Sequence, residues 1–303
     1  MKILKATHLG MCFGVRDAIA IARREAQREP VTVFGPLVHN PVVVSDLARK
    51  GVRIAETPER VGTGTVLISA HGASERARRR LARRARRIIE ATCPLVRRAH
   101  EALAELVADG CHPVVIGQRG HVEVRGLTED LPECDVILTE DDVNALRERP
   151  RFGVVAQTTQ PLERVERLVA ALRRRFPRSE VRVRNTVCRP TRDRQQAAIE
   201  LARRCTVVVV LGGANSNNTR ELAATCSRFC DRVHRVASAA DLRPEWFQAD
   251  DVVGLTAGTS TPDRSIAAVE RWLRRRAAAD VRPVWTTTPA REPARALTAV
   301  AVR

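Results

Sequence analysis

Three of the eight cysteines stand where a metal centre or an anion could be bound. Cys12, Cys93 and Cys188 each lie in a loop just before a segment of helical period, within MCFGVRDAI, TCPLVRRAH and VCRPTRDRQ. The N-terminus of a helix lowers the pKa of a thiol and favours a negatively charged ligand. Because the chain contains no close C-x-x-C pair, a metal site must collect its ligands from distant parts of the sequence.

A second group of polar residues occupies loops that follow predicted strands. These loops cover residues 38–40, 70–72, 120–123, 157–159, 215–218 and 258–260. Three of them carry a histidine, namely His39, His71 and His121, and the others carry serine, threonine or asparagine. Parallel α/β sheets bind ligands beyond the C-terminal ends of their strands. Imidazoles, hydroxyls and amides can donate hydrogen bonds to an anion without a lysine, so the pattern predicts a shared anion site.

The elements that must position these groups alternate along the chain. Short apolar, β-branched runs predict strands at 31–34, 66–69, 114–117, 136–139, 153–156, 206–211 and 252–256. Segments of helical period predict helices at 16–28, 42–50, 75–84, 95–109, 162–176, 192–204, 219–229 and 262–278. This alternation predicts an α/β protein with parallel sheets covered on both faces. The three cysteines are 81 and 95 residues apart, which suggests three lobes of similar size.

Composition narrows the class of protein. The chain has 303 residues, 44% of them hydrophobic, which excludes a wholly disordered protein. No apolar run is long enough to span a membrane and the N-terminus lacks a signal-type apolar stretch, so we expect a cytoplasmic protein. The net charge of +17 attracts acidic partners or nucleic acid. Aromatic residues make up only 3%, which disfavours single-stranded nucleic acid.

Two further segments and one absent motif bear on partners. Residues 75–87 are rich in arginine and are predicted to form one basic helix, either a solvated face or a docking patch for an acidic protein. Residues 281–303 are rich in proline and threonine and are predicted to form a tail. No G-x-G-x-x-G follows a strand before a helix, so electrons for a redox reaction must come from outside the chain.

A set of short motifs resembles, in order and spacing, those of the 4-hydroxy-3-methylbut-2-enyl diphosphate reductases. That family catalyses the last step of the methylerythritol phosphate route to isoprenoids. The motifs are MCFGV, HN at 39–40, SAHG at 69–72, ATCP at 91–94, GHVE at 120–123, QTT at 157–159, NSNNT at 215–219 and GTSTPD at 258–263. The resemblance covers about residues 1–280. The sequence departs from the family at Val122, where proline is common, and at Arg189 and Pro190, beside the third cysteine.

The resemblance implies a cloverleaf of three pseudo-equivalent α/β lobes around a central 4Fe–4S cluster. The lobes would cover residues 13–93, 94–186 and 187–280, the last together with 1–12. Cys12, Cys93 and Cys188 match the family's cluster ligands, which leave one iron without a protein thiolate. That open iron would bind the hydroxyl of the substrate as a Lewis acid while the cluster supplies electrons.

The resemblance also implies roles for the polar loops. The diphosphate would be bound by His39, His71, His121, Ser216, Asn218 and Ser260, with Asn217 a weaker assignment. Glu123 matches the family's acid, and Thr158 matches the threonine that bonds the alcohol and relays the proton. The reaction would be the two-electron reductive dehydration of the allylic diphosphate to isopentenyl and dimethylallyl diphosphates. Ferredoxin or flavodoxin would donate the electrons, and we expect a monomer or a weak homodimer that binds neither nucleic acid nor membrane.

Other interpretations of the same residues stay open at this point. The chain could be a diverged paralogue, or another three-lobed cluster dehydratase similar to quinolinate synthase, although such an enzyme would need arginines for a dicarboxylate. Three thiolates and a water would also suit an open zinc site. A protein that binds RNA through its basic surface is the non-catalytic alternative.

Overall fold

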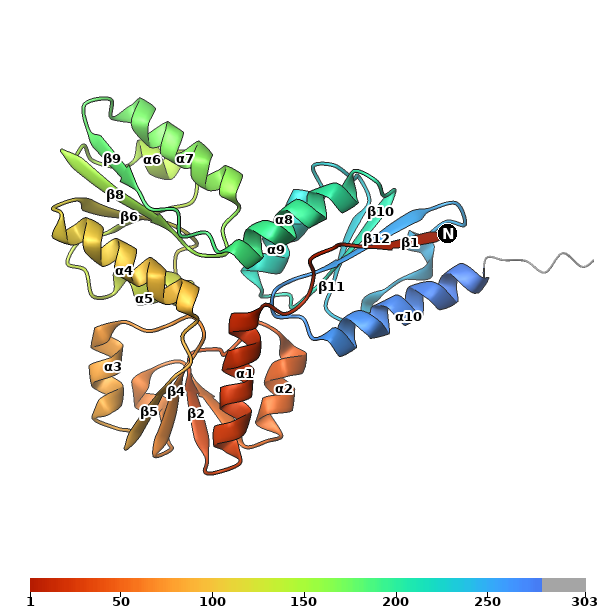
Figure 1. Cartoon of the computed structure of the whole chain (residues 1–303), viewed down its shortest axis with the longest axis horizontal. Coiled ribbons are helices and arrows are strands. Elements are labelled where there is room, and N and C mark those ends of the chain that lie inside the picture. Colours follow the sequence, from red (N-terminus) through yellow and green to blue (C-terminus); the bar gives the residue numbers. More distant parts are fainter. Residues whose placement is uncertain (280–303) are drawn as a thin grey trace, which may run out of the picture.

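The computed structural model describes residues 1–279, and the tail predicted at 281–303 lies outside the described residues. Three four-stranded sheets form, and the paired strands in each are parallel. Figure 1 shows each sheet with its helices as a separate lobe, and the three lobes meet at the middle of the molecule. The predicted α/β cloverleaf of parallel sheets is therefore confirmed.

The first lobe contains the sheet β3-β2-β4-β5. Its strands are β2 (Val31–Phe34), β3 (Val52–Ala55), β4 (Thr65–Ile68) and β5 (Arg87–Glu90). Its helices are α1 (Phe13–Ala26), α2 (Pro41–Ala48), the short turn η1 (Pro58–Arg60) and α3 (Glu75–Ala82). The central strands β2 and β4 are buried along their whole length, as expected for strands covered by helices on both faces.

The second lobe contains the sheet β7-β6-β8-β9. Its strands are β6 (His112–Ile116), β7 (Asp135–Ile137), β8 (Arg151–Ala156) and β9 (Glu180–Val183). Its helices are α4 (Pro94–Ala108), α5 (Val122–Thr128), α6 (Glu140–Asn144) and α7 (Leu162–Arg175). Thr139 begins α6 with a capping box, which satisfies backbone N–H groups that a helix start leaves free.

The third lobe contains the sheet β1-β12-β10-β11 and joins the two ends of the described chain. Its strands are β1 (Lys2–Lys5), β10 (Val207–Leu211), β11 (Val233–Val236) and β12 (Val252–Ala257). Its helical segments are α8 (Arg189–Ala202), α9 (Asn217–Cys226), η2 (Ala239–Asp241), η3 (Pro244–Trp246) and α10 (Asp263–Ala279). Among the described helices, none is long and apolar enough to cross a membrane.

The three sheets repeat one arrangement that positions the chemistry. One edge strand of each sheet (β1, β5 or β9) leads to a cysteine, and that cysteine is the N-cap of the next helix (α1, α4 or α8). The two central strands of each sheet lead to the polar loops. The division at 13–93, 94–186 and 187–280 with 1–12 keeps every sheet within one lobe, and we propose these boundaries.

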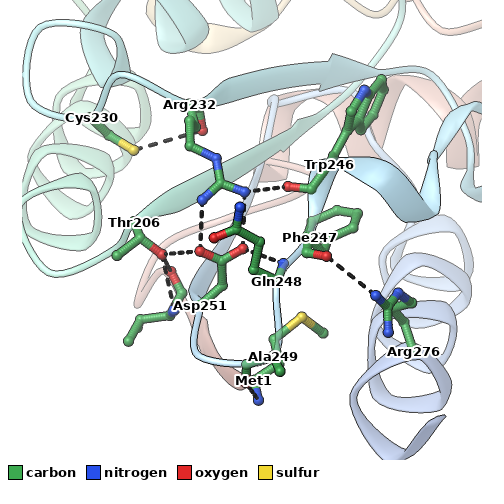
Figure 2. Close-up of polar contacts among 11 residues, drawn as sticks. Met1, Thr206, Cys230, Arg232, Trp246, Phe247, Gln248, Ala249, Asp251 and Arg276 are labelled. Atoms are coloured by element: carbon green, nitrogen blue, oxygen red, sulfur yellow. Dashed lines mark hydrogen bonds and ion pairs between the residues drawn. The ribbon is translucent and has the colours of Figure 1, made fainter. Parts of the chain in front are cut away.

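A buried carboxylate fastens the end of the third sheet that lies away from the polar loops. Figure 2 shows the donors around Asp251. Asp251 accepts two hydrogen bonds from Arg232, at 2.7 and 3.0 Å. It also accepts one from the Thr206 hydroxyl at 2.8 Å and one from the Gln248 N–H at 2.7 Å. Burial raises the pKa of Asp251, but these donors outweigh it and the pKa lies below its ordinary value. Arg232 also donates to the Trp246 carbonyl at 2.6 Å, so this group ties β10, β11 and β12 to the loop around η3.

All seven predicted strands and all eight predicted helices are present, with ends displaced by up to three residues. Five strands were not predicted: β1, β3, β5, β9 and β11. The prediction of one basic helix over 75–87 is wrong, because α3 ends at Ala82 and Arg87 begins β5, where it pairs beside Thr65 of β4.

Candidate active site

Three imidazoles from two lobes meet at the centre of the molecule. His39 follows β2, His71 follows β4 and His121 is the N-cap of α5. Their ring centroids lie 5.2 Å (His39–His71), 5.4 Å (His39–His121) and 5.6 Å (His71–His121) apart. The sequence predicted a shared site for these histidines, and the structure brings them together.

The third lobe supplies hydroxyl and amide groups to the same point. Ser216 is the N-cap of α9, Asn217 and Asn218 begin that helix, and Ser260 follows β12. All four line a cavity of about 50 Å³ that is also bordered by the three histidines, Glu123, Thr159 and Thr259. The N-terminus of α9 therefore points its backbone N–H groups and partial positive charge at the cavity, which favours an anion there.

Several polar atoms around this cavity have no hydrogen-bond partner in the described part of the chain, residues 1–279. Among the described residues, His39 Nε2, Asn217 Nδ2 and Ser260 Oγ are buried and unpaired. A buried polar group left unpaired costs on the order of 1–3 kcal/mol, so such groups call for a partner that residues 1–279 do not supply. Asn217 Oδ1 accepts from Arg220 at 2.9 Å and Asn218 Oδ1 accepts the N–H of Thr259 at 2.9 Å, so neither bond uses the NH2 group of its amide. Both asparagines therefore stay binding candidates, and the bond from Thr259 also ties Asn218 to the loop that carries Ser260.

The hydrogen bonds of two histidines fix which ring nitrogen carries a proton. His121 Nδ1 accepts the N–H of Glu123 at 3.2 Å, so the proton of the neutral ring sits on Nε2. His71 Nδ1 lies 3.1 Å from the Pro36 carbonyl, which can only accept, so His71 carries its proton on Nδ1. The Nε2 of neutral His71 is consequently an acceptor, and it can donate to an anion only after taking up a second proton.

Burial holds these imidazoles in their neutral form. It lowers the pKa of His39, and it lowers that of His71 well below the ordinary value, with the neighbouring His121 and His39 adding to the effect. Burial, followed by the charges of His39 and Arg220, lowers the pKa of His121 to about 4. An anion bound among the rings would offset part of this penalty.

Glu123 is a buried carboxyl beside the histidines. Only 1% of it is exposed, and burial raises its pKa to about 7. The N–H of Thr158 donates to Glu123 Oε1 at 2.6 Å, and this bond together with the Thr158 side chain moderates the increase. A carboxyl with a pKa near neutrality holds a proton and can release it, as a general acid must. Glu123 and Thr158 were both predicted as site residues, and they lie in direct contact.

The backbone of each cysteine is bonded to one of the polar loops. Cys12 N–H donates to the Thr259 carbonyl at 3.2 Å, Cys93 N–H to the Ala70 carbonyl at 3.0 Å, and Cys188 N–H to the Thr158 carbonyl at 3.0 Å. The three cysteines therefore lie immediately behind the loops that carry Ser260, His71 and Thr158. Figure 1 shows the first turns of α1, α4 and α8 converging on this central point.

The cysteines are also close enough to influence one another. A Cβ added to Gly14, in the first turn of α1, would lie 2.5 Å from Cys93 Sγ. Burial raises the pKa of Cys93 and raises that of Cys188 to about 11, and the charges of Cys12 and Glu123 act in the same direction on both. The expected lowering by helix N-termini is thus outweighed for these two thiols by burial. They need a positive partner to ionise.

Two features of the site could not be found by motif. Gly213 passes so close to the His39 loop that a Cβ there would lie 2.1 Å from the His39 carbonyl oxygen, so only glycine lets the first and third lobes approach here. Arg194 is a buried guanidinium on α8 that donates to the Gly10 carbonyl, at 3.0 Å from Nε and 2.7 Å from Nη2. It thereby fastens α8 to the segment that leads into Cys12.

The other five cysteines stand apart from this centre. Cys111, Cys226 and Cys230 are buried and Cys134 and Cys205 are partly buried, all within or against the apolar clusters of their lobes. The prediction that they are small apolar residues agrees with this packing.

The family model of the LytB protein matches residues 3–274 of the chain. The chain belongs to the LytB family. The 4-hydroxy-3-methylbut-2-enyl diphosphate reductase of Trichlorobacter lovleyi is 38% identical over 264 residues, which cover 86% of this chain and 94% of that protein. A solved structure of (E)-4-hydroxy-3-methyl-but-2-enyl diphosphate reductase is 34% identical with a TM-score of 0.65, over 90% of this chain and 99% of that one.

A second solved structure supports the fold alone. The E-1-hydroxy-2-methyl-but-2-enyl-4-diphosphate reductase of Plasmodium falciparum is 24% identical, with a TM-score of 0.83 over 90% of this chain and 87% of that one. The resemblance inferred from the sequence motifs is therefore confirmed at the level of family and fold.

Proposed function

We propose that this protein catalyses the reductive dehydration of (E)-4-hydroxy-3-methylbut-2-enyl diphosphate to isopentenyl and dimethylallyl diphosphates. The observation that carries the proposal is the composition of the central site, in which unpaired donors suited to a diphosphate surround a cavity beside a protonatable carboxyl. Three cysteines stand behind that cavity, one from each repeat of the fold. The proposal agrees with the reductases that the chain resembles over most of its length.

The cysteines fit a polynuclear iron–sulfur centre better than a single metal ion. In residues 1–279, the three histidines offer ligand atoms within 4.8 Å of one another, but the three cysteine sulfurs form no such group. A single zinc ion with Zn–S bonds of about 2.3 Å would need its sulfurs about 3.8 Å apart. A cluster spaces its sulfurs more widely because each binds a different iron. We therefore propose that Cys12, Cys93 and Cys188 would hold a 4Fe–4S cluster, which when bound supplies electrons and an open iron that acts as a Lewis acid.

The polar loops would bind and orient the diphosphate. His121 offers its Nε2 proton, and Asn217 and Ser260 offer donors that nothing else in the described chain uses. His39 and Ser216 lie beside them along the cavity. Because a charge-assisted hydrogen bond to an ionised oxygen is roughly twice as strong as a neutral one, the gain on binding is large for groups already desolvated.

Glu123 would deliver the proton that the departing hydroxyl requires. Its carboxyl is shielded from water, so its proton is retained until a more basic oxygen comes within reach. Thr158 holds one carboxyl oxygen through its backbone N–H and thereby directs the proton-bearing oxygen away from this bond. The allylic hydroxyl would leave as water from a pocket that excludes bulk solvent.

The electron donor is proposed to be ferredoxin or flavodoxin. Both are acidic carriers, which suits a chain of net charge +17 that lacks a nicotinamide or flavin fingerprint. A cytoplasmic location and a monomer or weak homodimer stay predictions from the sequence.

The proposal is tested with anaerobically purified protein, synthetic substrate and methyl viologen reduced by dithionite. We expect both isoprenoid diphosphates to appear, and no product with an iron-replete preparation would refute the function. Glu123→Gln is expected to bind inorganic pyrophosphate as tightly as the unaltered protein while losing turnover. Glu166→Gln, an exposed carboxyl on α7, is the matched control and should turn over normally.

A further inference from the structure

One surface groove of the molecule reaches a predicted cluster ligand from outside. It has a volume of about 570 Å³ and lies between α4 and the segment that leads from β9 into α8. Cys188 forms part of its wall, next to Val187 and Thr186. The groove is separate from the cavity that holds the histidines, with which it shares no lining residue.

The groove is bordered by arginines that are free to meet a partner. They are Arg98 of α4, Arg184 of the connecting segment, and Arg189 and Arg192 of α8. All four are exposed. Of these four arginines, only Arg189 has an ion-pair partner within residues 1–279, namely Asp193 at 3.5 Å, and the Arg189 side chain remains 83% exposed. Glu101 and Glu105 also border the groove, so its arginines outnumber its acids two to one.

The basic segment singled out in the sequence also carries unpaired arginines within residues 1–279, such as Arg76 and Arg79, but it lies away from the cysteines (Figure 1). Arg78 pairs with Glu75 and Glu90, Arg80 with Glu59, and Arg87 with Glu25 and Glu29. Their charge is therefore partly neutralised inside the first lobe. Figure 1 shows α3 on the outer side of that lobe, away from the point where α1, α4 and α8 converge.

We propose that the groove beside Cys188 is the docking site of a small acidic one-electron carrier protein. The inference rests on the proposed function and assigns its electron donor to a surface. A carrier whose carboxylates pair with Arg98, Arg184 and Arg192 would place its redox centre against the wall formed by Cys188. Arg189 adds a further charge directly beside Cys188.

The electron count sets how often the surface is used. Cleavage of the allylic C–O bond and formation of a C–H bond consume two electrons and two protons and release one water. Each carrier is oxidised by one electron when it reduces the protein, so two carriers must dock in turn for each product. Docking must then be brief, which suits an interface of solvent-exposed charges rather than a buried apolar one.

The test compares two variants with the same change of net charge. The first replaces Arg98, Arg184 and Arg192 by glutamate, and the second replaces Arg76, Arg79 and Arg83, which are exposed at α3 and without ion pairs within residues 1–279. Each holoenzyme is assayed with reduced ferredoxin and, separately, with dithionite-reduced methyl viologen. Binding of oxidised ferredoxin is measured by titration calorimetry, which needs no turnover.

We expect the groove variant to lose ferredoxin binding and to drop about tenfold or more in ferredoxin-driven kcat/KM, with its salt dependence flattened. Its viologen-driven rate should stay within about twofold of the unaltered enzyme, since none of the three residues lines the central cavity. The α3 variant should behave as the unaltered enzyme in both assays. Equal loss in the two variants, or loss only in the α3 variant, would overturn the docking site. Failure of viologen-driven turnover in the unaltered protein would instead overturn the proposed function.

Discussion

Replacing Gly14 by alanine tests whether the first turn of α1 must leave room for the sulfur of Cys93, the N-cap residue of α4. The added Cβ would lie 2.5 Å from Cys93 Sγ and 3.1 Å from Cys93 Cβ. An ordinary contact needs 3.4 Å or more, so the sulfur or the helix must shift by about 1 Å. Overpacking of this kind costs roughly 1–3 kcal/mol, against a gain of at most about 1 kcal/mol from replacing a helical glycine.

The consequence falls on metal loading rather than on folding. A displacement of about 1 Å is large compared with the tolerance of about 0.2 Å on metal–ligand distances. We expect Gly14→Ala to fold, to melt within a few degrees of the unaltered protein when free of metal, and to hold less than half its iron and acid-labile sulfide.

Gly126→Ala provides the matched control for this variant. Gly126 is also helical, but its added Cβ would come no closer than 3.5 Å to any atom outside its chain neighbours and its own helix backbone, the nearest being in His100. It should retain full iron and sulfide. Equal iron and sulfide in the two variants would refute the inference that Gly14 makes room for a ligand.

Three further predictions follow from the charges. Because Glu123 has a pKa of about 7, the protonated fraction of its carboxyl falls from about one half at pH 7 to about one hundredth at pH 9. Viologen-driven kcat/KM should therefore fall about 50-fold over that range. A flat pH profile would remove Glu123 as the proton donor. Neutral His71 carries its proton on Nδ1, toward the Pro36 carbonyl, so its Nε2 must be protonated before it can donate to pyrophosphate. Binding of inorganic pyrophosphate should therefore take up a proton above pH 6.5. Calorimetry in two buffers of different ionisation enthalpy measures this uptake, which His71→Asn should abolish. Asp251→Ala leaves Arg232 without its carboxylate partner and should lower the free energy of unfolding by about 3 kcal/mol. Activity per folded molecule should not change, because Asp251 lies at the end of the third sheet away from the polar loops. A loss below about 0.5 kcal/mol in urea unfolding would contradict the role given to Asp251 and its donors.

The sequence predicted the central strands and the loops that follow them because both carry strong local signals. β4 and β10 are runs of apolar residues, and His71 and Ser216 stand in polar segments directly after them. The edge strands were missed because their pattern is weak. β5 reads Arg-Ile-Ile-Glu after an arginine-rich segment, and only its pairing with β4 makes it a strand. Tertiary hydrogen bonding decided these elements, and local propensity did not.

The chemistry of the site depends on burial, which no local pattern reports. The pKa of Glu123 near 7 arises from its complete enclosure, and the raised pKa of Cys188 reverses what a helix N-terminus alone would give. The hydrogen bond from Thr259 to Asn218 likewise joins segments about forty residues apart in the sequence. Motif matching placed both amides in the site, with Asn217 the weaker assignment, and could not report this hydrogen bond.

Quantitative iron, zinc and acid-labile sulfide analysis of the anaerobically purified protein tests the central claim most directly. If Cys12, Cys93 and Cys188 hold one 4Fe–4S centre, the unaltered chain should contain four iron and four sulfide, and Cys93→Ser should lose both. One zinc ion without sulfide in the unaltered chain, or full iron and sulfide in Cys93→Ser, would contradict it.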